Sequence, residues 1–111
     1  QDIPQSPYNR TNVDTYYLQM ADRGHHIYKW TGDIVVPMDQ DVRFPVGTSI
    51  TIVSKNNNID IYCDDNETTR IYGVGNDSNN SNYTLAARGM ATLLKIDYDV
   101  WMLTGAVLTA N

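Results

Sequence analysis

Short runs in which apolar and polar residues alternate constrain the fold of this chain more than any other feature. The clearest run spans residues 48–54, where Ile50 and Ile52 share one face of an extended strand. Comparable runs recur at intervals of roughly 8 to 12 residues, with Gly-, Asn- or Asp-rich turns between them. No segment repeats apolar residues at the i, i+3, i+4, i+7 spacing of a helix for a useful length. We therefore predict an all-β fold, a single antiparallel β-sandwich with a jelly-roll-like arrangement.

The order of the runs predicts two hairpins. Residues 48–54 and 59–63 are separated by three asparagines, which tolerate positive φ at low cost. Residues 90–96 and 100–104 are joined by a short Asp-Tyr-Asp loop. Cys63 continues the alternation of the second run, so we expect it to face the core. A weak helical turn is predicted near residues 85–88, and the absence of crossover helices favours antiparallel pairing.

The first residues differ from the rest of the chain. Residues 1–14 contain Pro4 and Pro7 among polar residues and show no period, which is typical of an extended arm. We predict an N-terminal arm over residues 1–14 and a β-sandwich domain over residues 15–111. The arm is expected either to fray or to lie over a neighbouring subunit.

Charge and cysteine content exclude several classes of protein. The net charge is −5, and eight Lys and Arg spread over the chain do not form the basic face of a nucleic-acid-binding protein. No apolar stretch approaches the roughly 20 residues needed to span a bilayer. The single cysteine, Cys63, excludes an internal disulfide. We predict no nucleic-acid partner and no membrane partner.

No pattern in the chain indicates catalysis, a metal site or a cofactor. His25 and His26 are adjacent, and neighbouring residues of a strand point to opposite faces, so they are poorly placed to chelate one metal. The acidic stretch over residues 60–67 lacks the Asp-x-Asp-x-Asp-Gly spacing of a calcium loop, which favours a solvated turn. No serine has the context of a nucleophile. We therefore predict that the protein is not an enzyme and binds no cofactor.

Aromatic residues are the best candidates for a binding surface. The chain has eight Tyr and two Trp, more than a core of this size can hold. Tyr and Trp anchor interfaces because they combine a large apolar face with a polar tip. The early aromatics are predicted to contact a protein partner: Tyr8, Tyr16, Tyr17, Tyr28 and Trp30.

Several blocks of the sequence, in the same order, resemble a β-domain found in structural proteins of tailed bacteriophages. These blocks are YYLQMADRGHHIYKWTG (16–32), FPVGTSITIV (44–53), YTLAARGMATLLKI (83–96) and VWMLTG (100–105). The likeness covers about residues 15–108. The chain is most similar to the small capsid decoration, or staple, proteins of epsilon-fifteen-like short-tailed phages.

The resemblance implies a virion structural protein, made in the bacterial cytoplasm and bound to the outer surface of the head. It implies the major capsid protein as partner, and self-association as a homodimer. The alternative is a tail-fibre or tailspike domain that binds a glycan of the host cell surface, since exposed aromatic rings stack on sugars. A small hydrolase, the third hypothesis, lacks an identifiable site.

Overall fold

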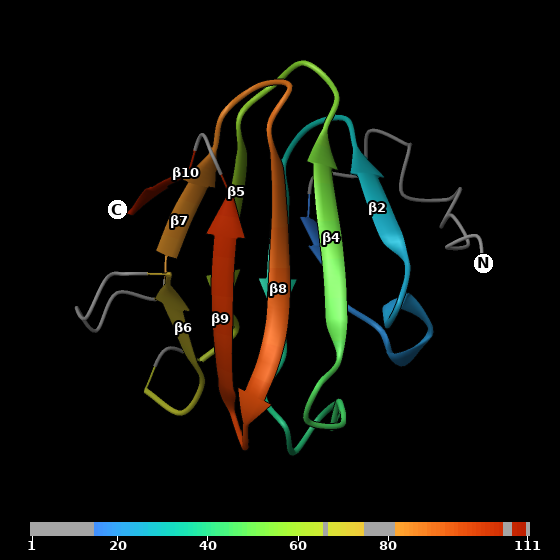
Figure 1. The fold of residues 1–111 in the computed structure, drawn as a ribbon, viewed down its shortest axis with the longest axis vertical. Coiled ribbons are helices and arrows are strands. Elements are labelled where there is room, and N and C mark those ends of the chain that lie inside the picture. The colour runs from blue at the N-terminus through green and yellow to red at the C-terminus, as the bar shows by residue number, and fades with distance from the viewer. Residues whose placement is uncertain (1–14, 66, 75–81, 106–107, 111) are drawn as a thin grey trace.

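Two five-stranded sheets account for most of the computed structural model, which describes residues 15–65, 67–74, 82–105 and 108–110. Sheet A contains, in spatial order, β2 (His26–Lys29), β4 (Ser49–Ser54), β8 (Met90–Asp97), β9 (Val100–Gly105) and β6 (Arg70–Gly73). Sheet B contains β1 (Thr15–Tyr17), β3 (Asp33–Val36), β5 (Ile59–Cys63), β7 (Asn82–Leu85) and β10 (Leu108–Ala110). Figure 1 views the molecule with sheet A in front. The predicted all-β character is confirmed.

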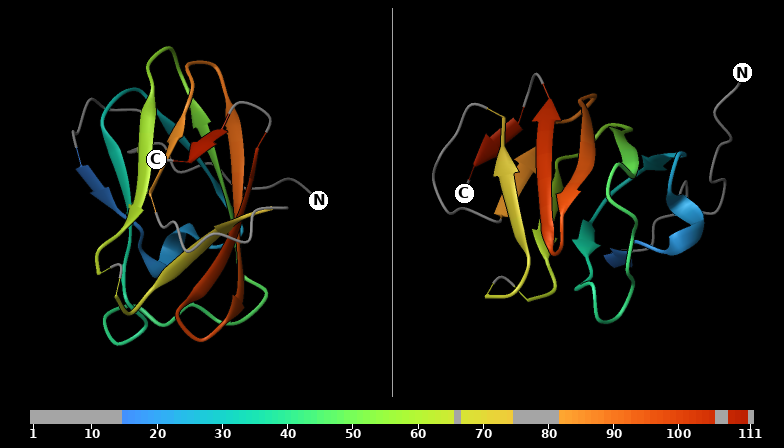
Figure 2. Two further views of the ribbon diagram at one scale, coloured as in Figure 1. Left: turned by 90° about the vertical axis from the view of Figure 1, so that its left-hand side faces the viewer. Right: turned by 60° about the horizontal axis from the view of Figure 1, so that its bottom comes forward.

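The two sheets pack face to face around one apolar core (Figure 2). Alternation along each strand sends every second side chain inward, as the pleat of a β-strand requires. The core draws from both sheets and from two connecting segments. Its largest members include Ile27, Ile52, Leu93 and Trp101 from sheet A and Ile34, Ile61, Tyr83 and Leu85 from sheet B. Phe44, in the loop between β3 and β4, packs edge-on against Trp101 with ring centroids 5.4 Å apart. This shared core fixes which face of each sheet points outward.

The sheets are mixed, which corrects the prediction of purely antiparallel pairing. Strand pairs β1–β3, β2–β4, β3–β5 and β6–β9 run parallel. Pairs β4–β8, β5–β7, β7–β10 and β8–β9 run antiparallel. From β2 to β5 the chain passes from one sheet to the other at each turn, so β3 serves as the crossover that brings β4 parallel to β2. We expected antiparallel pairing because the sequence predicts no crossover helices. That expectation is wrong because a strand of the opposite sheet can connect two parallel strands in place of a helix. The jelly-roll-like arrangement stays a prediction.

The predicted hairpin of residues 48–54 and 59–63 is wrong. Strands β4 and β5 lie in different sheets, and the asparagine turn between them arches over the core (Figure 1). The side chain of Asn57 donates a hydrogen bond to the carbonyl oxygen of Trp30 (3.0 Å), and the hydroxyl of Ser54 donates to the carbonyl oxygen of Asn57. These bonds hold the arch against the neighbouring connection from β2 to β3.

The second predicted hairpin is confirmed. Strands β8 and β9 pair antiparallel from Ala91 opposite Gly105 to Asp97 opposite Val100, with an irregularity between Lys95 and Asp97. Asp99 in the turn has φ +55°, a left-handed conformation that Asp adopts more readily than most residues. Residues 82–85 form strand β7, so the helical turn predicted from Leu85 onward is not present.

Other predictions for the N-terminal third have mixed outcomes. The predicted β-domain begins with the short strand β1, and a 3₁₀ helix, η2 (Met20–Asp22), leads from it into β2. The predicted arm, residues 1–14, lies outside the described residues. Cys63 is buried among core residues, as predicted.

Candidate functional site

The first two predicted contact residues lie on β1 and point in opposite directions. Tyr16 turns toward the core, and its hydroxyl donates a hydrogen bond to Oδ2 of the buried Asp22 (2.8 Å). The same oxygen accepts the backbone N–H of Gln19 (2.8 Å), so Tyr16 helps to hold the 3₁₀ helix. Tyr17 points outward and is 51% exposed. Only Tyr17 of this pair is therefore free to contact a partner.

Tyr28 and Trp30, two further predicted contact residues, also differ from each other in position and exposure. Tyr28 lies opposite Val53 in the register of β2 and β4 and is half-buried on the outer face of sheet A. Trp30 follows β2 and is 36% exposed, with the ammonium of Lys55 3.6 Å from the centroid of its ring. Tyr8 lies outside the described residues. The five residues therefore do not form one patch.

One side of the sandwich nevertheless collects exposed apolar side chains. Strands β1 and β2 end their respective sheets on the same side of the molecule (Figures 1 and 2). Three large side chains next to these strands are exposed: Tyr17 ends β1, Met20 lies in η2 between the two strands, and Trp30 follows β2. We call these three residues the β1–β2 edge. The ammonium of Lys55 covers one face of the Trp30 indole ring.

The outer face of sheet A carries a row of hydroxyl-bearing residues across its middle. Strand pairing places His26, Thr51, Thr92 and Thr104 side by side from β2 to β9. The hydroxyl groups of Thr51 and Thr92 are hydrogen-bonded (3.2 Å). We call this the threonine row. Thr92 lies at its centre, on the middle strand of the five.

Apolar side chains flank the threonine row on both sides. The upper row, above it in Figure 1, contains Tyr28, Val53 and Met90, and the lower row contains Ser49, Leu94, Met102 and Tyr72. Met90 is 59% exposed and Leu94 is 41% exposed. No Asp, Glu, Lys or Arg belongs to these three rows, and Arg70 and the exposed Asp97 lie beyond the lower row, on either side of Val100. The described outer face of sheet A is therefore uncharged over most of its area.

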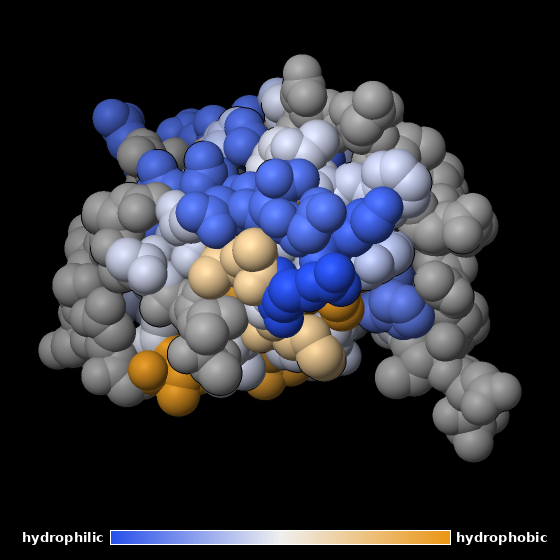
Figure 3. Space-filling model, turned by 90° about the horizontal axis from the view of Figure 1, so that it is seen from above, coloured by the Kyte–Doolittle hydropathy of each residue, from blue (hydrophilic) through white to orange (hydrophobic). Residues whose placement is uncertain are grey.

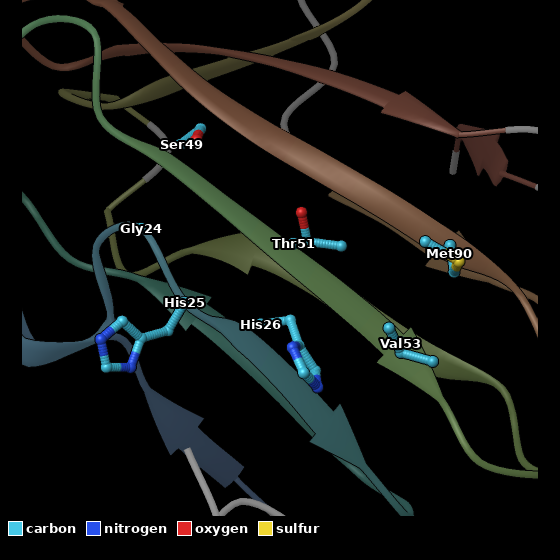
Figure 4. A pocket seen from close by; sticks show the side chains of 7 residues that line it. All are labelled: Gly24, His25, His26, Ser49, Thr51, Val53 and Met90. Carbon is cyan, nitrogen blue, oxygen red and sulfur yellow. The ribbon is translucent and has the colours of Figure 1, made fainter. Parts of the chain in front are cut away.

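A hollow of about 360 Å³ lies over β4 on this face. Its floor is formed by the short outward side chains of β4, Ser49, Thr51 and Val53 (Figure 4). His26 on β2 and Met90 on β8 form its two sides. The hollow arises because a strand of small side chains lies between strands that carry larger ones.

The outer face of sheet B is acidic. Asp33 on β3 lies directly opposite Asp60 on β5. The hydroxyl of Tyr62 donates to Oδ2 of Asp33 (3.1 Å), and the hydroxyl of Thr84 donates to Oδ1 of Asp60 (2.9 Å). Burial raises the pKa of Tyr62, and its hydrogen bond to Asp33 and the charge of that carboxylate raise it further. In Figure 3 the hydrophilic colour covers the upper part of the molecule, and hydrophobic side chains appear at the lower rim, toward sheet A.

A charged cluster is buried at the lower end of the sandwich. Nζ of Lys95 lies 2.7 Å from Oδ1 of Asp39 and donates to the carbonyl oxygen of Phe44 (2.9 Å). The carboxylates of Asp39 and Asp99 each accept the backbone N–H of the other residue (3.0 and 2.7 Å), and Thr69 donates to Asp99 (3.1 Å). The cluster ties the loop after β3 to the β8–β9 hairpin. Its hydrogen bonds are satisfied within the protein, which is how a structural ion pair is retained in a core.

The residues weighed for chemistry in the sequence are spread over different environments. No group of three or more His, Cys, Asp or Glu that could hold a metal ion occurs among the described residues. In the acidic stretch, Asp60 accepts a hydrogen bond from Thr84, whereas Asp65 accepts bonds from the backbone of Glu67 (3.0 Å) and the hydroxyl of Thr68 (3.3 Å) within its own turn. Asp60 therefore links β5 to β7, whereas Asp65 stabilises its own turn.

Sequence reasoning did not single out the uncharged face of sheet A. The signal for this face lies in residues 90–96. Met90 and Leu94 alternate with the buried Ala91 and Leu93, so the strand is apolar on both sides. A two-sided apolar strand in a sandwich leaves one apolar face outside the core.

Comparison with protein-family models gave no match, and comparison with curated protein sequences gave none. Within the part of the chain that the structure describes, no helix has the length and apolar character required to cross a membrane.

Proposed function

We propose that this chain is a virion structural protein, a capsid decoration or staple protein that binds the outer surface of a phage head. Its partner would be the major capsid protein, and it would be made in the cytoplasm of the bacterial host. The observation that carries the proposal is the exposure of Tyr17, Met20 and Trp30 along the β1–β2 edge. Large aromatic and Met side chains are enriched in interface cores and supply most of the binding energy there. The phage resemblance supplies the identity of the partner.

The β1–β2 edge suits attachment to a protein shell. It belongs to a sandwich whose two sheets share one core, so its side chains are held by a rigid framework. A protein that binds only the assembled lattice stabilises that lattice by mass action. A decoration protein that contacts two capsid subunits gains further from effective concentration. We propose that the protein resists outward pressure from packaged DNA in this way.

The alternative proposal is a tail-fibre or tailspike domain that binds a host glycan. The observation that favours it is the exposed indole of Trp30, since aromatic faces stack on sugar rings. Lys55 occupies one face of this ring, at 3.6 Å from the centroid, so a sugar has only the other face available. Copy number separates the two proposals, because a head protein occurs in hundreds of copies per particle and a tail part in a few.

The capsid proposal is tested by co-sedimentation with heads assembled without this protein. We expect the double substitution Tyr17→Ser and Trp30→Ser to weaken binding at least tenfold, because it removes both aromatic anchors from the edge. The matched control is Tyr98→Ser, which removes an exposed tyrosine from the β8–β9 turn at another part of the molecule. Equal binding by the double variant and the wild type would refute the role of the β1–β2 edge.

A further inference from the structure

The buried Lys95 and Asp39 are placed to react with each other, which the proposed function neither uses nor requires. We propose that Nζ of Lys95 and Cγ of Asp39 form an intramolecular isopeptide bond, with the release of one water molecule. The bond ties the loop after β3 to β8 and closes a covalent ring that contains β4, β5, β6 and β7. Such a cross-link stabilises a fold by constraining the unfolded chain, as a disulfide does.

The fold holds the two reacting groups in contact. Lys95 points inward from β8, and Asp39 lies in the loop between β3 and β4. Nζ lies 2.7 Å from Oδ1 of Asp39, and Cγ is one carbon–oxygen bond of about 1.2 Å from Oδ1, so Nζ and Cγ are no more than about 4 Å apart. Reacting atoms in a near-attack arrangement are about 3–3.5 Å apart, and groups held in this way react far faster than free groups in solution.

Burial favours the neutral forms of the two groups, which are the forms that react. The side chains of Lys95 and Asp39 are only 1% and 2% exposed, and the ring of Trp101 lies beside the amine, with its centroid 5.5 Å from Nζ. Two charges taken out of water carry a large desolvation penalty. Transfer of one proton from Nζ to Oδ1 along their hydrogen bond relieves this penalty, and it leaves a neutral amine beside a neutral carboxylic acid.

The other hydrogen bonds of the pair suit the steps that follow. The lone pair of Nζ attacks Cγ, and the π electrons of the Cγ–Oδ2 bond move onto Oδ2, which accepts the backbone N–H of Asp99 (3.0 Å). A second proton passes from Nζ to Oδ1, and Oδ1 leaves as water when the Cγ–Oδ2 double bond forms again. The third proton stays on the amide nitrogen and keeps an acceptor, because Nζ already donates to the carbonyl oxygen of Phe44 (2.9 Å).

A cavity gives the released water a way out of the core. It has a volume of about 300 Å³ and is lined by both reacting residues, Lys95 and Asp39. Arg43, Val46 and Tyr98 also line it, and all three are exposed. The cavity therefore leads from the buried pair to the surface. Departure of the water from a site that is otherwise apolar favours the amide over its hydrolysis.

Mass spectrometry of the purified chain tests the bond. We expect an intact mass one water molecule below that of the sequence, which is 12.5 kDa. Trypsin does not cleave after an acylated lysine, so the digest should contain residues 30–43, which include Asp39, joined to residues 89–111, which include Lys95. An intact mass equal to that of the sequence, or a mass deficit without this joined peptide, would overturn the proposal.

Two lysine variants assign the missing water to this pair. Lys95→Met removes the nucleophile and should have the full mass of its own sequence. The matched control is Lys29→Met, which removes the other buried lysine of sheet A and should keep both the mass deficit and the joined peptide. A deficit that persists in Lys95→Met would reject the bond, because another dehydration would then cause it. Stability does not replace this measurement, since Lys95→Met removes the ion pair as well as the bond, and the digest of the wild type decides even if a variant fails to fold.

Discussion

Apart from Arg70 and Asp97 at the lower end of sheet A, the two sheets place their charged residues on opposite sides. Sheet A turns Lys29 and Lys95 toward the interior and leaves its outer face uncharged over three rows. Sheet B has an apolar inner face and turns Asp33 and Asp60 outward. Both sheets are built from alternating strands, so alternation does not determine which side of a strand meets water. The outer face of sheet A is the unusual one, because it is uncharged over three rows. We attribute this lack of charge to contact with another protein.

The largest effect on stability should come from the charge inside sheet A. Lys95→Met leaves the carboxylate of Asp39 buried without its ammonium partner, which should cost about 3–5 kcal/mol of unfolding free energy. The matched control is Asp60→Asn, which removes a charge from the outside of sheet B. This substitution removes the charged acceptor of the Thr84 hydroxyl, but it also removes the repulsion between Asp60 and Asp33. We therefore expect the unfolding free energy to change by no more than about 1 kcal/mol.

Urea unfolding of these two variants measures the difference. If Lys95→Met and Asp60→Asn change the unfolding free energy by similar amounts, the contrast between an interior charge on sheet A and an exterior charge on sheet B is wrong. The comparison requires that the slope of the unfolding free energy against urea concentration is the same in both variants, because an equal slope shows that the same surface is exposed on unfolding.

A smaller effect should appear at alkaline pH and should depend on sheet B. Burial is the main cause that raises the pKa of both Tyr62 and Tyr83 above 10.0. For Tyr83, the hydrogen bond that the backbone N–H of Gly73 donates to its hydroxyl opposes this rise only in part. Below pH 10 both phenols are neutral in the folded and unfolded states. Above it the unfolded chain loses its protons first, so stability should fall as the pH rises through the folded pKa values.

The measurement is the unfolding free energy between about pH 9 and pH 11.5. Tyr62→Phe should show a shallower decline than the wild type, because one raised pKa is removed along with its contact to Asp33. An equal or steeper decline in Tyr62→Phe would contradict the assignment of this pH dependence to the acidic face.

The sequence predicted strands well and their partners poorly. Residues 90–96 and 100–104 form the predicted hairpin, because a short loop between long apolar strands leaves few alternatives. Residues 48–54 and 59–63 do not, because a short asparagine turn suits an arch between sheets as well as a hairpin. In both arrangements Ile52 and Ile61 reach the same core, so hydrophobic alternation cannot distinguish them.

The candidate site was predicted only in part for a related reason. Tyr17 and Trp30 are exposed, whereas Tyr16 turns inward and its hydroxyl donates a hydrogen bond to Asp22. Strand alternation separates neighbouring tyrosines, so a cluster in sequence is not a cluster in space. The uncharged face of sheet A assembles residues from five strands, and only their pairing shows that Thr51, Thr92 and Thr104 are neighbours.

The location and copy number of the protein in purified virions test the central claim most directly. Quantitative mass spectrometry of whole particles, with cryo-electron microscopy of the same sample, gives both values. We predict hundreds of copies on the outer surface of the head, seated across boundaries between major capsid proteins. A few copies confined to the tail, or none in the particle, would contradict the proposal.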